Sequence, residues 1–87
     1  MSDQPEISFP LDWEFRIVTE SGMTGQAEAA CLGILHRTDS RAVISRGLES
    51  KGGKYITLRA VCHIADRDVL KDVSDAMVAV NGVKMLI

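Results

Sequence analysis

The sequence predicts a small α+β domain, in which a four-stranded antiparallel sheet carries two helices on one face. Three observations predict this fold class. Apolar and polar residues alternate most regularly over 55–64, a segment with helical periodicity lies on each side of that stretch, and a turn rich in lysine and glycine precedes it. The alternation fits a strand with one buried side and one side open to solvent.

The N-terminal end differs in character from the rest of the chain. Residues 1–10 are polar and contain both prolines, so we expect a flexible tail that docks only near Phe9 and Pro10. The remaining residues have the length of one small domain. We therefore expect a single folded domain over 11–87.

Periodicity predicts the first strand and the first helix. Between Trp13 and Thr19, large apolar residues occupy every second position, which is typical of a strand. The segment 20–25 combines turn formers with helix-capping residue types, so it should end the strand and start a helix. Apolar residues then recur at helical spacing, and they predict a helix from about Thr24 to Arg37.

The second half of the domain should contain two more strands, a helix and a final strand. A strand within 41–49 is expected to pair antiparallel with the strand 55–64 across the glycine turn. A helix is expected over 65–80, because Asp66 is a good N-cap and the apolar residues after it form a stripe. The last strand should run over 83–87.

The predicted order of elements is strand, helix, strand, strand, helix, strand. Two β-α-β units with right-handed crossovers, joined by a hairpin, make a ferredoxin-like sandwich. Its first and third strands are central, and its second and fourth strands are edges open to pairing with another chain. The expected core consists of Trp13, Phe15, Ile17, Cys31, Ile34, Leu35, Ile56, Leu58, Ala60, Cys62, Val69, Val73, Met77 and Val80.

Composition and charge exclude several classes of partner. The net charge of −2 provides no general attraction for nucleic acid or for an anionic membrane. No segment approaches the roughly 18 apolar residues of a membrane span, and the N-terminus lacks the features of a signal peptide. We therefore expect a cytoplasmic protein. Cys31 and Cys62 match no zinc or redox spacing, so they are expected to be buried thiols.

Three stretches of the chain carry a resemblance to a known family. They are FPLDWEFRIV at 9–18, SKGGKY at 50–55 and GVKMLI at 82–87, and in order and spacing they resemble the YbeD-like family of small bacterial proteins. The resemblance implies the ferredoxin-like fold and a similarity to the ACT domain, a regulatory module that binds small effectors, often amino acids, at dimer interfaces. It also implies a connection to lipoate metabolism, and it supplies no catalytic residues.

The glycine turn is the first candidate binding site. Lys51, Gly52, Gly53 and Lys54 could bind an anion, because glycine exposes backbone amides and lysine adds positive charge. The alternative is a solvated hairpin tip, which the absence of a phosphate-loop pattern favours. The turn also departs from the usual family pattern by one extra glycine.

Two further candidates lie elsewhere on the predicted fold. Arg16, Arg59 and His63 should share the open side of the sheet, where they make either a small binding surface or an ordinary exposed face. Gly22 and Gly25 lie in the turn before the first helix, where the ACT resemblance implies that an effector binds at the helix N-terminus. No residues have the spacing of a metal site or of a nucleophile with its base.

These observations predict a non-enzymatic regulatory or interaction module without a cofactor. In one form it binds a small effector, and in the other it docks a protein partner through the open sheet face or an edge strand. Weak homodimerisation is expected, because the domain is small and has two unpaired edges. RNA recognition is disfavoured, since the open side offers Tyr55 and no second aromatic residue for stacking.

Overall fold

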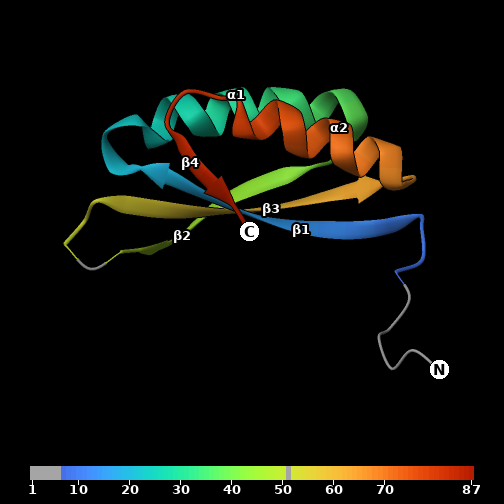
Figure 1. Ribbon diagram of the computed structural model, residues 1–87, viewed down its shortest axis with the longest axis horizontal. Coiled ribbons are helices and arrows are strands. Elements are labelled where there is room, and N and C mark those ends of the chain that lie inside the picture. Colours follow the sequence, from blue (N-terminus) through green and yellow to red (C-terminus); the bar gives the residue numbers. More distant parts are fainter. Residues whose placement is uncertain (1–6, 51) are drawn as a thin grey trace.

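The computed structural model describes residues 7–50 and 52–87, and it confirms the predicted fold (Figure 1). The elements are β1 (Leu11–Glu20), the short 3₁₀ helix η1 (Ser21–Met23), α1 (Thr24–Thr38), β2 (Val43–Glu49), β3 (Tyr55–Ile64), α2 (Arg67–Val78) and β4 (Val83–Leu86). The strand order is β2-β3-β1-β4, so β1 and β3 are central and β2 and β4 are edges, as predicted. Lys51 and most of the predicted tail, residues 1–6, lie outside the described residues.

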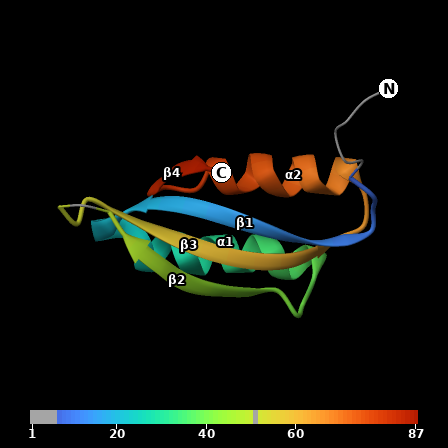
Figure 2. The same cartoon turned by 90° about the horizontal axis from the view of Figure 1, so that it is seen from below.

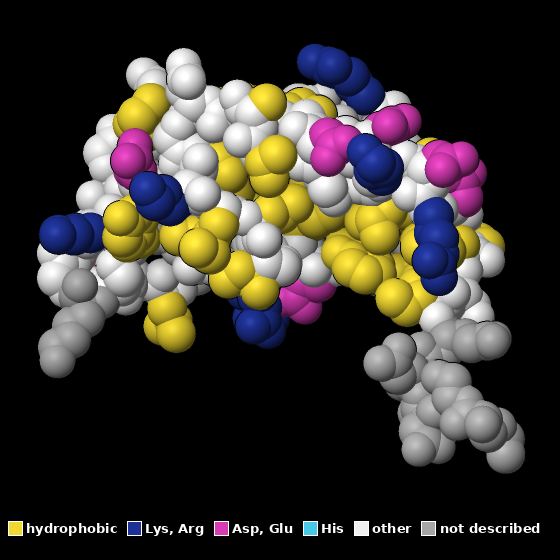
Figure 3. Space-filling model, viewed as in Figure 1, with side chains coloured by type: hydrophobic (Ala, Val, Ile, Leu, Met, Phe, Trp, Pro, Cys, Tyr) yellow, Lys and Arg dark blue, Asp and Glu magenta, His cyan; other side chains and the backbone are white. Residues whose placement is uncertain are grey.

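Both helices cover the same face of the antiparallel sheet (Figure 1). Figure 2 looks onto the opposite face, where no helix intervenes between the viewer and the central strands. Neither helix in the described part of the chain is both long and apolar enough to cross a membrane. The outer surface of α2 is covered by acidic and basic side chains (Figure 3), and it includes the ion pair between Lys71 Nζ and Asp75 Oδ2 at 2.8 Å.

The core lies between the helices and the sheet, where the predicted alternation of β1 and β3 puts its apolar side. Every second residue of β3 from Leu58 to Ile64 is buried, because successive side chains of a strand point to opposite faces. Five residues of the predicted core are only partly buried, so the prediction overstated their burial: Trp13, Ile34, Ile56, Val69 and Val80. Trp13 packs at the margin of the core and Phe15 at its centre.

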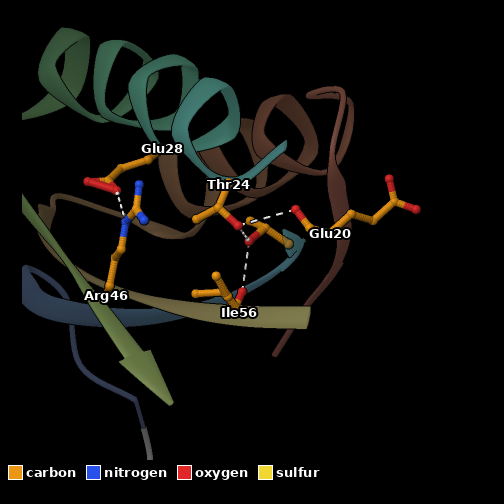
Figure 4. A network of polar contacts seen from close by, with 6 residues as sticks. Glu20, Thr24, Glu28, Arg46 and Ile56 are labelled. Carbon is orange, nitrogen blue, oxygen red and sulfur yellow. Dashed lines mark hydrogen bonds and ion pairs between the residues drawn. The ribbon is translucent and has the colours of Figure 1, made fainter. Parts of the chain in front are cut away.

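The start of α1 differs from the prediction of a side-chain cap. The N-cap is Met23, which makes no capping hydrogen bond. Instead, the buried Thr24 hydroxyl shares its one proton between the Glu20 carbonyl oxygen at 3.2 Å and the Thr19 hydroxyl oxygen at 2.8 Å. Thr19 in turn donates to the Ile56 carbonyl oxygen at 2.8 Å (Figure 4). These bonds satisfy two hydroxyl groups that burial would otherwise penalise.

The start of α2 confirms the prediction. Asp66 accepts a hydrogen bond from the Val69 backbone N–H at 3.0 Å, which is the usual N-cap bond. After α2, Gly82 has a φ of +92°, a region that favours glycine. A Cβ atom at this position would also lie 2.7 Å from Met23 Cβ, so the turn before β4 packs directly on the start of α1.

The β2–β3 hairpin contains the two irregularities that shape the open face of the sheet. Gly52 and Gly53 both have positive φ, at +86° and +72°, so the tip requires residues without a side chain. Along β2 the register shifts between Arg46 and Glu49, which indicates a bulge. Within it, a Cβ atom at Gly47 would lie 2.9 Å from the Thr57 carbonyl oxygen, so the two strands approach too closely there for any other residue.

Candidate functional site on the open sheet face

The open face is the side of the sheet that the helices leave uncovered. The alternation and the register of the strands determine which residues lie on it. They include Asp12, Glu14, Arg16, Val18 and Glu20 of β1, Val43 and Ser45 of β2, Tyr55, Thr57, Arg59, Val61 and His63 of β3, and Met85 of β4.

Two arginines lie directly opposite each other at the middle of this face. Arg16 of β1 and Arg59 of β3 are register partners, an arrangement in which like charges destabilise the strand pair. Glu14 partly offsets the repulsion, because its Oε1 accepts from both Nε and Nη2 of Arg59 at 2.7 Å. Among residues 7–50 and 52–87, no carboxylate lies within ion-pair distance of Arg16. Arg16 therefore carries a positive charge that no ion pair of the described residues compensates.

A cleft of about 370 Å³ has both arginines in its lining, and we call it the arginine cleft. It is lined by Arg16, Gly47, Leu48, Thr57, Arg59 and Ile87. The bulge of β2 leaves the Leu48 side chain 86% exposed beside the cleft. Ile87 lies next to Arg16, because the backbone N–H of each residue donates to the carbonyl oxygen of the other. Cationic groups, the Thr57 hydroxyl and two apolar side chains thus surround one opening, which suits a small anion with an apolar part.

A second cleft of about 510 Å³ lies at the other end of the open face, and we call it the acidic cleft. Its lining consists of Asp12, Asp39, Arg41, Val43, Val61 and His63. His63 Nδ1 lies 3.0 Å from Asp12 Oδ1. Asp39, in the loop after α1, accepts from the backbone N–H of His63 at 2.9 Å and from that of Arg41 at 3.0 Å. These two backbone hydrogen bonds lower the pKa of the Asp39 carboxyl.

The structure separates residues that the sequence grouped together. Arg16 and Arg59 are register partners, but His63 does not join them, because it lies four positions along the extended strand from Arg59, a distance of roughly 13 Å. His63 belongs to the acidic cleft instead, beside Asp12. All three residues lie on the open face, as predicted, and their joining in one binding surface stays a prediction.

The other predicted site residues that the structure describes, Gly22, Gly25, Gly52, Gly53 and Lys54, lie at one end of the molecule. The Ser21 backbone N–H donates to the Lys54 carbonyl oxygen at 3.0 Å, so the hairpin tip adjoins the start of α1. Gly22 and Gly25 have no positive φ. A Cβ atom at Gly22 would meet no described atom within 4 Å, and one at Gly25 would lie 3.9 Å from Arg46 Nη2. Nothing in the described structure therefore requires glycine at these two positions.

Both cysteines of the chain are free and buried. Burial raises the pKa of the Cys31 thiol to about 11, and burial followed by the charge of Asp39 raises the pKa of Cys62. Both thiols are therefore protonated and unreactive at neutral pH. In the described part of the chain, no three of His, Cys, Asp and Glu lie together in a way that could hold a metal ion.

Comparison with solved structures identifies the class of domain. The ACT domain from the GTP pyrophosphokinase of Chlorobium tepidum matches with a TM-score of 0.58 and 25% identity, over 90% of this chain and 96% of that one. The C-terminal domain of the MgtC protein from Mycobacterium tuberculosis matches with a TM-score of 0.66 and 13% identity, over 95% and 89%. The fold is ACT-like, as the resemblance implied.

The chain belongs to the family described as "Protein of unknown function (DUF493)", whose model matches residues 4–87. This is the YbeD family, which the three stretches of sequence indicated. The solution structure of protein HP0495 from Helicobacter pylori matches with a TM-score of 0.76 and 17% identity, over 99% of this chain and 90% of that one. No curated protein matches the chain in sequence.

Proposed function

We propose that this protein is a non-enzymatic regulatory module that binds a small anionic effector in the arginine cleft. The observation that carries the proposal is the Arg16–Arg59 pair. Two like charges in register cost stability, and only one of them has a carboxylate partner among the described residues. An anion between the two guanidinium groups removes this cost, because each group can donate charge-assisted hydrogen bonds to it.

The surroundings of the pair support a small ligand. The arginine cleft has the volume of a site for a compact metabolite, and its wall combines a hydroxyl group with two exposed apolar side chains. The protonated thiols of Cys31 and Cys62 support a non-enzymatic role and agree with a reducing, cytoplasmic location. The ACT-like fold supports regulation, and the connection to lipoate metabolism implied by the family resemblance makes lipoate one compound to test.

A thermal-shift screen tests the proposal. The compounds are inorganic phosphate, short carboxylates, amino acids, lipoate and nucleotides, each measured at 20 and 300 mM NaCl. A ligand that binds only the folded state at ten times its Kd contributes about 1.4 kcal/mol, which raises the Tm of so small a domain by roughly 6–11 °C. The shift should shrink at the higher salt concentration, because screening weakens the attraction.

Two variants identify the site. Arg16→Gln should reduce the ligand-induced shift by more than half, whereas Arg67→Gln on the exposed surface of α2 should leave it unchanged. A wild-type protein whose Tm no anion raises would contradict the proposal, and so would a shift that is equal in both variants. Backbone chemical shifts of the bound protein would show whether the ligand lies instead at Gly22, Gly25 or the hairpin tip, the positions that the sequence predicted.

A protein-docking adaptor is the second candidate function. The observation that favours it is Leu48, a large apolar side chain that the β2 bulge leaves exposed on an edge strand. A protein partner that pairs with this edge should bind the Leu48→Ser variant at least about tenfold more weakly. The anionic effector would keep its two arginines in that variant and would lose its apolar contact with Leu48.

A further inference from the structure

Three successive rows of residues cross the open face from strand to strand. The central row consists of Glu14, Val61 and Val43, which are register partners on β1, β3 and β2. On one side lies the row that contains Asp12 and His63, and on the other lies the row that contains Arg16 and Arg59. Each outer row is two residues from the central row, which is roughly 6.8 Å.

The outer rows carry opposite charge. Asp12 is 72% exposed, and Asp39 adds a second carboxylate at the same end. Arg16 at the other end lacks a carboxylate partner among the described residues. The central row presents two exposed apolar side chains, Val43 at 63% and Val61 at 42%. The face therefore has two exposed valines and the Arg59-paired Glu14 at its centre, with the Asp12 row on one side and the Arg16 row on the other; Arg41 offsets part of the negative charge beside Asp12.

We propose that the open face is self-complementary and binds a second copy of this chain. A two-fold axis that lies across the strands at the central row exchanges the two outer rows. It brings Asp12 of each copy over Arg16 of the other, and it brings the valines of the two copies together. It also places the two Glu14 carboxylates near each other, each ion-paired with Arg59 of its own chain. Face-to-face sheets pack about 10 Å apart, a distance that such side chains bridge.

The second copy is the occupant that fits both ends of the face at once. A purely acidic partner would neutralise Arg16 and be repelled by Asp12, and a purely basic partner would do the reverse. With the axis at the central row, only the part of the sheet from Leu11 to Ile17 of β1 can overlap in the two copies, because β1 begins three residues before Glu14. The overlap is roughly 23 Å along the strands and roughly 14 Å across β1, β3 and β2. This is smaller than a typical stable interface, so the dimer should be weak, with a Kd of roughly 100–500 µM.

This inference goes beyond the proposed function and is independent of it. Arg16 serves both the effector and the second copy, so the two compete for the same guanidinium group. Binding of an anion to the monomer and association of two copies are measured separately, and either one can fail while the other holds.

Charge reversal tests the interface. Sedimentation velocity at 20 mM NaCl, from 10 µM to 1 mM protein, should show that wild type associates. Asp12→Lys alone and Arg16→Glu alone should each weaken association at least about tenfold, because both variants bring like charges together across the axis. An equimolar mixture of the two variants should recover association to within about threefold of wild type, because the introduced lysine of one copy then faces the introduced glutamate of the other.

Matched controls use the charged surface of α2, which the proposed interface does not include. Asp72→Lys and Arg67→Glu change the net charge in the same way and should leave association unchanged. Circular dichroism checks that every variant is folded. If Asp12→Lys does not fold, Asp12→Asn and Arg16→Gln replace the reversals, and each should weaken association about threefold.

Three results would overturn the inference: a wild-type monomer throughout the concentration range, single reversals that associate like wild type, or a mixture of reversals that stays monomeric.

Discussion

Replacing Arg16 by glutamine should make the protein more stable. In the folded state Arg16 lies opposite Arg59, and Arg59 already has Glu14 as its partner. Glutamine keeps part of the aliphatic stem that covers the sheet and removes the unpaired charge. Most substitutions lower the free energy of unfolding, so a gain here would identify Arg16 as a residue that the fold does not need.

The size of the gain follows from the geometry of the pair. Directly opposed cross-strand residues interact by roughly 0.2–1 kcal/mol. The Arg59 side chain is 56% exposed, and the Glu14 carboxylate offsets part of its charge, so the lower half of that range applies. We expect a gain of about 0.2–0.5 kcal/mol at low salt, which is a rise in Tm of roughly 1–4 °C for a domain of this size.

Urea denaturation at 20 and 500 mM NaCl measures this effect without changing the ionic strength along the titration. The gain should be present at low salt and should shrink at high salt, where the Debye length falls to a few ångströms. This salt dependence separates charge repulsion from the general scatter of surface substitutions, which Arg67→Gln measures. Arg59→Gln should show no such gain, because it also removes the ion pair with Glu14.

A lower stability of Arg16→Gln at both salt concentrations would refute this reasoning. It would mean that Arg16 stabilises the sheet through packing, and the main argument for an anion in the arginine cleft would be lost.

Three other predictions concern the framework around the site. Trp13→Ala should lower the free energy of unfolding by about 1.5–3 kcal/mol, less than the roughly 3–5 kcal/mol expected for Phe15→Ala, because Trp13 is only partly buried. Denaturant midpoints compare the two variants, and equal losses would contradict this ranking. Gly47→Ala should lower the free energy of unfolding by more than about 1 kcal/mol, because the alanine Cβ would lie 2.9 Å from the Thr57 carbonyl oxygen, which the strand holds in place. A melting temperature equal to that of wild type would mean that the bulge relaxes freely. The pKa of Asp39 in the folded protein is below that of an unfolded aspartate, about 3.9, so its carboxylate stabilises the fold above pH 3.9 and this contribution is lost as the pH falls through the folded pKa. Asp39→Asn should therefore make stability depend less on pH on the acid side, as measured by urea denaturation from pH 7 to 2. An unchanged profile would disprove the role of the bonds that Asp39 accepts from His63 and Arg41.

The fold could be predicted from the sequence because its signals are local. The alternation of β3 determined which of its faces is buried, and Asp66 marked the start of α2. The start of α1 was harder to predict. There the Thr24 hydroxyl has the Glu20 carbonyl oxygen and the Thr19 hydroxyl as hydrogen-bond partners. This arrangement depends on the position of the neighbouring strand, so no local pattern indicates it.

The site could be predicted only in part. Alternation placed Arg16 and Arg59 on the open face, but their direct opposition depends on the register between β1 and β3, which no local pattern determines. The separation of His63 from Arg59 could have been found, since four residues of strand span too great a distance for one small ligand. No sequence pattern indicated a role for Leu48 or Asp39. Leu48 is exposed by the bulge in β2, and Asp39 is positioned by a hydrogen bond from β3.

The two buried threonines have a consequence for how the protein opens. Thr19 joins the end of β1 to Ile56 of β3 and to Thr24 of α1, so no one of these three segments can detach without leaving a hydroxyl or carbonyl group unpaired in the interior. The first turn of a helix ordinarily frays independently of its neighbours. Here that turn and the adjoining ends of β1 and β3 should open together, and their amide hydrogens should exchange with solvent with one shared free energy of opening.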